Sequence, residues 1–362
     1  MFIKWLELHD FRNYGELRFE PAQSGITLIV GDNGQGKTSL IEAICYLVSR
    51  RSFRGASKET VIGYDSNEAI IRAGFSSSQK RDILLEASLS RTRRDRFLFN
   101  KQSISKVSES TNVIPITVFA AQDIDVVRGA PAMRRDFLDG CVATLYPRGS
   151  SVIAAVERVL RQRAMLLKQS GGVLTPEISS TLDVWDSQLS QYGSKLVEFR
   201  QELVSLIAPY VNDAYRKISG TSETISLNYR TSWTGELRDE LVKIRKDDLR
   251  KQANGLGPHR DELDIELDSH SVRHNGSQGE QRTAAYALKV AFHSMYKDRT
   301  GEDPILLLDD VFSELDSSRS EAILNSVLAT QTIMTTTGDL PGIVHPALKI
   351  TVNRGVLVGT VK

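Results

Sequence analysis

The sequence predicts an α/β fold in which a core sheet and an antiparallel β subdomain are interrupted by an inserted helical lobe with a short arm. Residues 26–30 form a continuous apolar run that ends at a glycine, which is typical of a strand covered on both faces of its sheet. Residues 305–308 form a second run of this kind. Between the two runs, residues 153–206 place apolar side chains three and four positions apart, as helices do.

The first hundred residues predict strands around one helix. Phe2 to Leu8 mixes β-branched, aromatic and charged residues, and Leu17 and Phe19 then alternate with charged residues, which indicates a hairpin. After Lys37 the apolar residues return at helical spacing. Glu68 to Phe99 again has the pattern of short strands. We therefore expect an antiparallel subdomain beside the core sheet.

Two apolar stripes describe the helical middle of the chain. The first runs from Ile153 to Leu167, and the second runs from Trp185 to Leu206 in alternating steps of four and three, like a coiled-coil seam. A Gly-Gly pair separates them, so they fit either a short antiparallel arm or an ordinary helical subdomain. Strand spacing returns at residues 263–267. We assign residues 1–128 and 300–362 to one lobe, lobe I, and residues 129–299 to a helical lobe II.

The composition is that of a globular protein. Of the 362 residues, 40% are hydrophobic and 25% are charged, so the chain can bury a sizeable core and is not disordered. The 46 basic and 45 acidic residues give a net charge of +1. This balance excludes a globally basic nucleic-acid binder, but it leaves room for a local basic patch.

Composition also bears on the cellular compartment. Cys45 and Cys141 form no Cys-x-x-Cys pair, which fits a reducing compartment and argues against a cysteine-built zinc site. Lys4, Glu7 and Asp10 make the N-terminus unlike a signal peptide. No uncharged apolar run approaches the roughly 20 residues that a membrane helix needs. We expect a cytoplasmic protein without a membrane partner.

Residues 31–38 read GDNGQGKT and match the phosphate-loop pattern G-x-x-x-x-G-K-[ST] at every fixed position. The glycines let the backbone curl so that successive N–H groups point at an anion, and the following helix aims its N-terminus there. Lys37 can reach the β- and γ-phosphates of a nucleotide, and Thr38 can ligate Mg²⁺. A fortuitous glycine-rich turn is the alternative, but the flanking strand and helix are the context that a phosphate loop requires. The candidate nucleotide-binding residues of this segment are Gly31, Asn33, Gly34, Gly36, Lys37, Thr38 and Ser39.

Two carboxylates follow the buried run at residues 305–308. The strand delivers Asp309 and Asp310 to the carboxyl edge of the sheet, where the phosphate loop also lies. We expect Asp309 to hold Mg²⁺, and Asp310 to position or deprotonate the water that attacks ATP. Alternatively the two aspartates cap the next turn, which a phosphate loop in the same chain disfavours.

The sequence SQGEQR at residues 277–282 resembles the signature of ABC-type ATPases, which opens a helix. Ser277 is a suitable N-cap, Gly279 permits close approach of another backbone, and good helix formers follow. The resemblance implies that Ser277, Gly279 and Gln281 of one protomer close on the γ-phosphate held by another. A plain capped helix is the alternative.

Four further stretches resemble the RecF family of DNA-repair proteins. They are DFRNY at residues 10–14, GAP followed by RRDFLD within residues 129–139, GPHRDEL at 257–263 and LDDVFSELD at 308–316. The resemblance runs to about residue 340 and covers essentially the whole chain. It implies the fold of an ABC-type ATPase head, a P-loop core sheet with an antiparallel subdomain, which SMC proteins share with far longer arms.

The resemblance also implies an ATP-dependent DNA-binding protein of recombinational repair and replication restart. Two copies would dimerise around ATP and Mg²⁺, clamp gapped or junction DNA, and help to load RecA together with RecO and RecR. ATP hydrolysis would be weak, stimulated by DNA, and would drive release. The alternatives are a transporter ATPase subunit, whose switch histidine is missing here, and a small-molecule kinase, which has no use for a signature helix.

The resemblance assigns two more residues and two more short stretches. Gln122 stands at the Q-loop, where it would contribute to catalysis and to the metal site, within AQD in place of the more usual PED. Arg54 stands where SMC-like heads place an arginine near the γ-phosphate. Alternatively, Arg54 is a charged residue of the solvated surface. Residues 313–316 correspond to the D-loop at the dimer interface. Residues 335–337 are threonines and replace the switch histidine.

Two basic clusters are candidate DNA contacts. The first comprises Arg50, Arg51 and Lys58 around Arg54, and the second comprises four arginines within residues 91–96. Contacts from such residues to phosphates would make DNA affinity fall with salt. Each cluster is also consistent with a solvated turn. No helix has a base-reading character, so we expect little sequence specificity.

Overall fold

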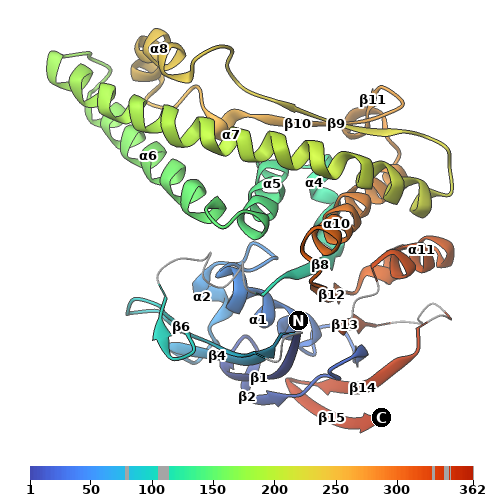
Figure 1. Ribbon diagram of the computed structural model, residues 1–362. Coiled ribbons are helices and arrows are strands. Elements are labelled where there is room, and N and C mark those ends of the chain that lie inside the picture. The colour runs from blue at the N-terminus through green and yellow to red at the C-terminus, as the bar shows by residue number, and fades with distance from the viewer. Residues whose placement is uncertain (78–80, 105–113, 328–330, 338–341, 343, 362) are drawn as a thin grey trace.

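The computed structural model describes residues 1–77, 81–104, 114–327, 331–337, 342 and 344–361. Helices lie over one side of a six-stranded core sheet, and an antiparallel sheet lies on its other side (Figure 1). The core strands are β3 (Gly25–Val30), β8 (Ile116–Ala120), β12 (Ile305–Asp309), β13 (Gln331–Thr336), β14 (Pro346–Asn353) and β15 (Val356–Val361). Their order is β15-β14-β3-β13-β12-β8, and all neighbours are parallel except β14 and β15.

Both predicted core strands are confirmed as β3 and β12, and β13 lies between them. Leu28 and Leu306 belong to the hydrophobic core under the helices, whereas Ile29 and Leu307 belong to the core on the opposite face. Successive side chains of a strand point to opposite faces, so a strand buried on both faces needs apolar residues at every position. The continuous apolar runs in the sequence record this burial.

The predicted antiparallel subdomain is also present. Its sheet has the order β2-β1-β4-β5-β6-β7, and the N-terminal hairpin pairs Leu8 with Leu17. The helix α1 (Lys37–Ser49) is buried along almost its whole length between this sheet and the core sheet. The six strands are β1 (Phe2–Phe11), β2 (Tyr14–Phe19), β4 (Glu68–Ser76), β5 (Asp82–Ser90), β6 (Arg96–Phe99) and β7 (Gln102–Ser103).

A helical layer covers the other face of the core sheet (Figure 1). Within it α6 and α7 form an antiparallel hairpin around Gly171 and Gly172, whose φ angles of +60° and +85° suit glycine. Because α7 packs against α10 as well as α6, most of it is part of a helical subdomain and only the glycine end projects. The main helices are α5 (Pro131–Leu145), α6 (Gly149–Gln169), α7 (Pro176–Ser219), α8 (Leu237–Lys251) and α10 (Gln278–Thr300).

The predicted seam along α7 is wrong at its C-terminal end. Leu206 is only half-buried, and Ile207 is fully buried in its place, followed by Val211. A straight α-helix repeats every 3.6 residues, so its buried stripe drifts away from a strict heptad unless the helix supercoils. The stripe on α7 drifts because the helix passes from α6 onto α10 instead of winding around one partner.

A small third sheet completes the helical side. The predicted strand at residues 263–267 is confirmed as β10 (Glu262–Leu267), which pairs with β11 (His270–Ser271) and β9 (Ile225–Arg230). The sequence analysis missed β9. Its ISLNYR sequence is largely solvated, and Ile225 alone is deeply buried, so the apolar alternation is weak.

The proposed lobe boundaries fall at ends of helices. Residue 128 ends α4 (Asp125–Arg128), and residue 300 ends α10. Leu28 and Leu306 of the core sheet nevertheless share one hydrophobic cluster with Leu203 of α7, across both boundaries. The division into two lobes therefore stays a prediction. Separately, none of the described helices combines the length and the apolar character needed to cross a membrane.

Candidate nucleotide-binding site

The phosphate loop joins the end of β3 to the start of α1, as its sequence predicts. Gly36 has a φ of +116°, and a Cβ at this position would lie 2.7 Å from the Asn13 side-chain nitrogen. A Cβ at Gly31 would collide with the backbone oxygen of Val352. The glycines are therefore required by two flanking segments, β1–β2 on one side and β14 on the other.

These flanking segments hold the loop by its carbonyl groups. Asn13 Nδ2 donates to the Gln35 carbonyl at 3.0 Å, and the Tyr14 hydroxyl donates to the Gly36 carbonyl at 3.0 Å. From the other side, the N–H of Gly355 donates to the Gln35 carbonyl at 3.0 Å. The N–H of a trans peptide points away from its carbonyl, so the N–H groups of Gly36 and Lys37 point away from Asn13 and Tyr14. This arrangement gives the DFRNY stretch a physical role in shaping the loop.

Lys37 lies over the loop that precedes it. Its Nζ donates to the carbonyls of Gly31 and Asp32 at 2.6 and 2.8 Å. Burial lowers the pKa of Lys37, against the attraction of Asp310 and Asp309, which raises it. The ammonium group is thus held close to the carboxylates by neutral acceptors that an anion can replace.

The structure brings the two predicted carboxylates to the phosphate loop. Thr38 Oγ1 donates to Asp309 Oδ1 at 2.8 Å, although the two residues are 271 positions apart. Thr335 Oγ1 donates to the same oxygen at 2.8 Å. Burial raises the pKa of Asp309, and the two hydroxyl hydrogen bonds oppose that shift. Asp310 follows in a left-handed conformation with a φ of +50° and lines the neighbouring pocket.

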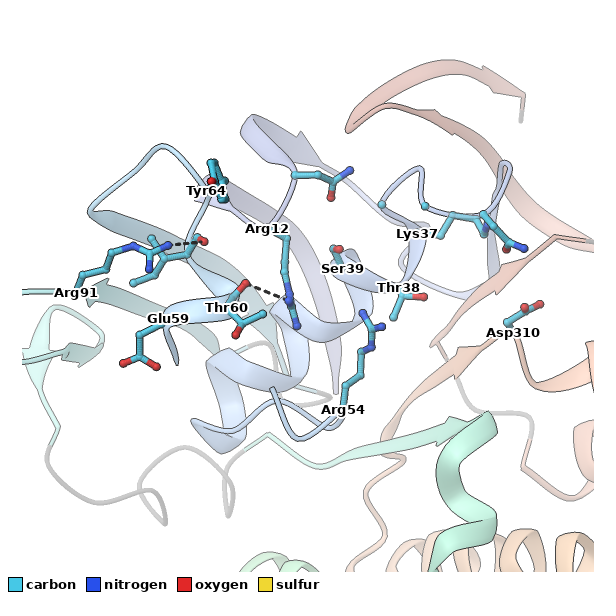
Figure 2. Close-up of a pocket in the computed structure, with 15 residues that line it drawn as sticks. Arg12, Lys37, Thr38, Ser39, Arg54, Glu59, Thr60, Tyr64, Arg91 and Asp310 are labelled. Carbon is cyan, nitrogen blue, oxygen red and sulfur yellow. Dashed lines mark hydrogen bonds between the residues drawn. The ribbon is translucent and has the colours of Figure 1, made fainter. Parts of the chain in front are cut away.

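A pocket of about 520 Å³ extends from the phosphate loop across the antiparallel subdomain. Figure 2 shows Lys37, Thr38 and Asp310 at one end and Tyr64 and Arg91 at the other. Most predicted residues of the loop line this pocket, namely Asn33, Gly34, Gly36, Lys37, Thr38 and Ser39. One end is therefore suited to phosphates, and the other offers an aromatic ring whose residue is 95% exposed.

Sequence analysis missed the residues at this second end apart from Arg91, which it assigned to a candidate DNA-contact cluster. Thr60 lies in a short helix, α2 (Lys58–Val61), and Ile62 and Tyr64 follow that helix; all three line the pocket. Arg12, between the two ends, lies in the DFRNY stretch, which was the one available signal. Its guanidinium donates to both oxygens of the fully buried Glu42 at 2.8 and 2.7 Å.

The two residues assigned by resemblance near the γ-phosphate have different positions. Arg54 lines the pocket, and its side chain extends between α1 and Asp310 in Figure 2. Gln122, in the 3₁₀-helix η1 (Ala121–Ile124), is not among the residues that line the described pocket. Its Nε2 donates to the Phe53 carbonyl at 3.3 Å, so it contacts the residue that precedes Arg54.

The signature stretch opens α10 with a capping box. Ser277 Oγ accepts a hydrogen bond from the Glu280 N–H at 3.3 Å, while Glu280 Oε2 accepts one from the Ser277 N–H at 2.7 Å. Gln281 Nε2 donates to three carbonyls of the preceding turn, including that of Gly276 at 3.2 Å, which holds the turn in place. A Cβ on Gly279 would lie 3.3 Å from the Arg319 guanidinium. Within one chain, neither Ser277 nor Gly279 lines the described pocket.

The first basic cluster is not a single open patch. Arg50 lies with its guanidinium 4.4 Å from the centre of the Phe97 ring and is half-buried. Arg51 is exposed and forms an ion pair with Glu157 of α6 at 3.4 Å. In the same cluster Lys58 pairs at 3.3 Å with Asp95.

In the second cluster, Arg91 donates to backbone carbonyls beside the pocket, including that of Ser66 at 2.9 Å. Arg93 forms a long ion pair with Glu68 at 3.7 Å. Arg94 and Arg96 are exposed. The two predicted clusters thus divide into cations that build the protein and a few, such as Arg51, that face solvent.

Comparisons with known proteins identify relatives along nearly the whole chain. A family model described as the RecF/RecN/SMC N terminal domain matches residues 2–338. The DNA replication and repair protein RecF of Clostridium tetani is 33% identical over 348 residues, which cover 93% of each chain. The RecF protein of Agathobacter rectalis is 35% identical over 339 residues, which cover 93% of this chain and 92% of the relative.

Solved structures agree with these relatives. A structure of the recombination mediator protein RecF with ATP, from the RecFOR pathway, is similar with a TM-score of 0.91 and 26% identity, covering 100% of this chain and 98% of that chain. An SMC head bound to the winged-helix domain of ScpA is similar with a TM-score of 0.59 and 14% identity, which concerns the fold alone. The ABC-type ATPase head fold is thereby confirmed, and this chain belongs to the RecF family.

Proposed function

We propose that this protein is an ATP-dependent DNA-binding protein of recombinational DNA repair and replication restart. The observation that carries the proposal is the meeting of the phosphate loop, Asp309 and Asp310 at one end of an open pocket. RecF relatives are named for DNA replication and repair, and a structure similar to this one contains ATP. Family membership also disfavours the transporter-subunit and kinase alternatives.

ATP fits the pocket in one direction. Its phosphates would lie at the glycine loop beside Lys37, and its base would lie toward Tyr64. Aromatic side chains such as Tyr64 can stack on a base. The donor set of Thr38 and Asp309 suits Mg²⁺, because hydroxyl and carboxylate oxygens are ligands that this ion prefers. Mg²⁺ would supply charge neutralisation at the phosphates.

The chain's own groups would divide the work of slow, DNA-stimulated hydrolysis. Lys37 would bind the β- and γ-phosphates by charge-assisted hydrogen bonds, and Arg54 would face the γ-phosphate. Asp310 would orient or deprotonate the attacking water. Gln122 would act on the water and the metal site after a movement toward the pocket from its present contact with the Phe53 carbonyl, next to Arg54.

A second copy of the chain would complete the site. Ser277 and Gly279 lie outside the pocket of their own chain, and a signature stretch of this kind acts on a nucleotide held by another protomer. We therefore propose an ATP-induced homodimer, with Gln281 holding the signature turn in shape. Dimerisation would close a clamp on gapped or junction DNA, in work shared with RecO, RecR and RecA.

Analytical ultracentrifugation with ATP, ADP or no nucleotide tests this proposal. We expect a dimer with ATP only, and ATP-dependent binding to gapped DNA in a parallel assay. Ser277→Arg should bind ATP normally and remain monomeric, because a bulky cation would block the approach of the other protomer's phosphate loop. Lys217→Arg, on an exposed helix end, serves as a charge-conserving control. A Ser277→Arg protein that still dimerises with ATP would contradict the composite site.

A further inference from the structure

The hydroxyl of Thr335 contacts both carboxylate residues of the site. Thr335 lies near the end of β13, directly beside Asp309 of β12 in the parallel register, and its side chain is 1% exposed. Its Oγ1 donates to Asp309 Oδ1 at 2.8 Å and accepts from the Asp310 N–H at 3.1 Å. One buried hydroxyl thus bridges the side chain of one aspartate and the backbone of the next.

The first of these bonds orients the Asp309 carboxylate. Thr38, which precedes Asp309 in the chain, and Thr335, which follows it, both donate to Asp309 Oδ1 at 2.8 Å each. Two donors on one oxygen fix the rotation of the carboxylate and therefore the direction in which Oδ2 points. A hydroxyl has one proton to donate and two lone pairs that accept, so Thr335 can accept from the Asp310 N–H while it donates to Asp309.

The second bond stabilises the backbone at Asp310. This residue has a φ of +50°, a left-handed conformation that costs a non-glycine residue energy and persists only where neighbours hold it. The Asp310 nitrogen also lies 3.3 Å from the Thr335 carbonyl oxygen, so both the hydroxyl and the carbonyl of Thr335 accept from this N–H. The Thr337 hydroxyl, 3.4 Å from Asp310 Oδ1, supports the side chain from the same strand end.

We propose that Thr335 is a positioning residue that sets Asp309 for Mg²⁺ and Asp310 for the attacking water. This inference rests on the proposed function of the site. This role differs from that of a switch histidine. The buried Thr335 hydroxyl contacts Asp309 and Asp310, and it would act through them and not on the nucleotide itself. The proposal gives a role to one of the threonines that replace the switch histidine in this sequence.

The same strand offers a matched control. Thr332 is fully buried, like Thr335, and its Oγ1 has no hydrogen-bond partner among the described residues. Thr332→Val and Thr335→Val remove the same atom, add the same methyl group and leave the backbone of β13 unchanged. Thr335→Ser keeps the hydroxyl and removes only the methyl group.

The experiment measures the affinity of the full chain for a fluorescent ATP analogue, with Mg²⁺ and with EDTA, followed by kcat and KM of hydrolysis. The factor by which Mg²⁺ raises the affinity for the analogue should be smaller in Thr335→Val than in wild type by about tenfold or more. The affinity measured in EDTA should change little. Its kcat should fall on the order of a hundredfold, because misplaced catalytic groups are costly. Thr335→Ser and Thr332→Val should both resemble wild type.

Three results would overturn the inference. They are a normal Mg²⁺ gain and kcat in Thr335→Val, equal losses in Thr332→Val and Thr335→Val, or a Thr335→Ser protein as impaired as Thr335→Val. Each would assign Thr335 to packing alone. Wild-type protein that fails to bind the analogue at all would instead contradict the proposed function, so the two failures are distinguishable. Thermal melting without nucleotide verifies that every variant is folded.

Discussion

Charges are used in opposite ways at the two ends of this molecule. At the phosphate end of the pocket, neutral groups hold the charged ones: Lys37 donates to backbone carbonyls, and Asp309 accepts from threonine hydroxyls. No ion pair joins Lys37 to Asp309 within the described part of the chain. At the glycine end of the helical hairpin, Arg163 is fully buried and donates to Asp186 at 2.7 Å and to Asp248 at 2.6 Å.

The difference separates a binding site from a structural element. Buried opposite charges that are joined compensate each other's charge, whereas charges held apart by neutral partners can accept a charged ligand. The Arg163 group ties α6, α7 and α8 together at the projecting end of the hairpin. It fixes how three helices pack in a region with few apolar contacts, where Leu167, Leu182 and Leu249 form a small separate cluster.

The largest effect on stability is expected at this hairpin end. Arg163→Met should lower the free energy of unfolding by about 3–5 kcal/mol, because Asp248 would remain buried without its cation and Asp186 would keep only Arg245. Nucleotide affinity of the folded fraction should not change. Urea unfolding followed by circular dichroism measures the loss, and Arg161→Met, on the exposed face of the same helix, is the control. An Arg163→Met protein that loses ATP binding but keeps the wild-type stability would contradict the assignment of Arg163 to structure alone.

The next effect is on the rate of hydrolysis. Asp310→Asn should lower kcat by about a hundredfold or more, since a general base contributes roughly that factor, while ATP stays bound and the DNA complex persists. Hydrolysis and DNA release should be followed together. Asp309→Asn, which should weaken Mg²⁺ binding instead, is the comparison. Hydrolysis at the wild-type rate in Asp310→Asn would show that Asp310 is not the base.

A somewhat smaller effect is expected on nucleotide affinity. Lys37→Met removes charge-assisted contacts to phosphate that contribute on the order of 1.5–3 kcal/mol each, so ATP affinity and ATP-dependent DNA binding should both fall. Stability without nucleotide should change little, because Lys37 bonds only loop carbonyls there. Calorimetric titration and thermal melting measure the two quantities. Destabilisation as large as that of Arg163→Met would mean that Lys37 is structural too.

The smallest effect is expected at the solvent-facing cation. Arg51→Ala should weaken DNA binding without sequence bias and lower the slope of log affinity against log salt by about 1, as for one lost phosphate contact. Glu157→Gln, which releases Arg51 from its ion pair, should act in the opposite direction. Arg50→Ala should reduce stability through its lost contact with Phe97. A salt slope unchanged in Arg51→Ala would place the DNA contacts elsewhere.

Local patterns in the sequence determined much of the fold. The buried strands β3 and β12, the phosphate loop and the capped helix that starts at Ser277 depend on residues within a few positions of one another. Burial on both faces, curling at glycine and capping by serine are all local requirements, so they leave a readable pattern. The family resemblance added Arg54, which does line the pocket.

Only the tertiary structure decided which distant residues meet. It placed β13 between β3 and β12, brought Thr335 to Asp309, added Tyr64 to the pocket and turned Arg50 onto Phe97. Such contacts join segments separated by tens or hundreds of residues, and no local periodicity records them. They follow from how the sheets and helices pack together to bury their apolar faces, which is a property of the whole chain.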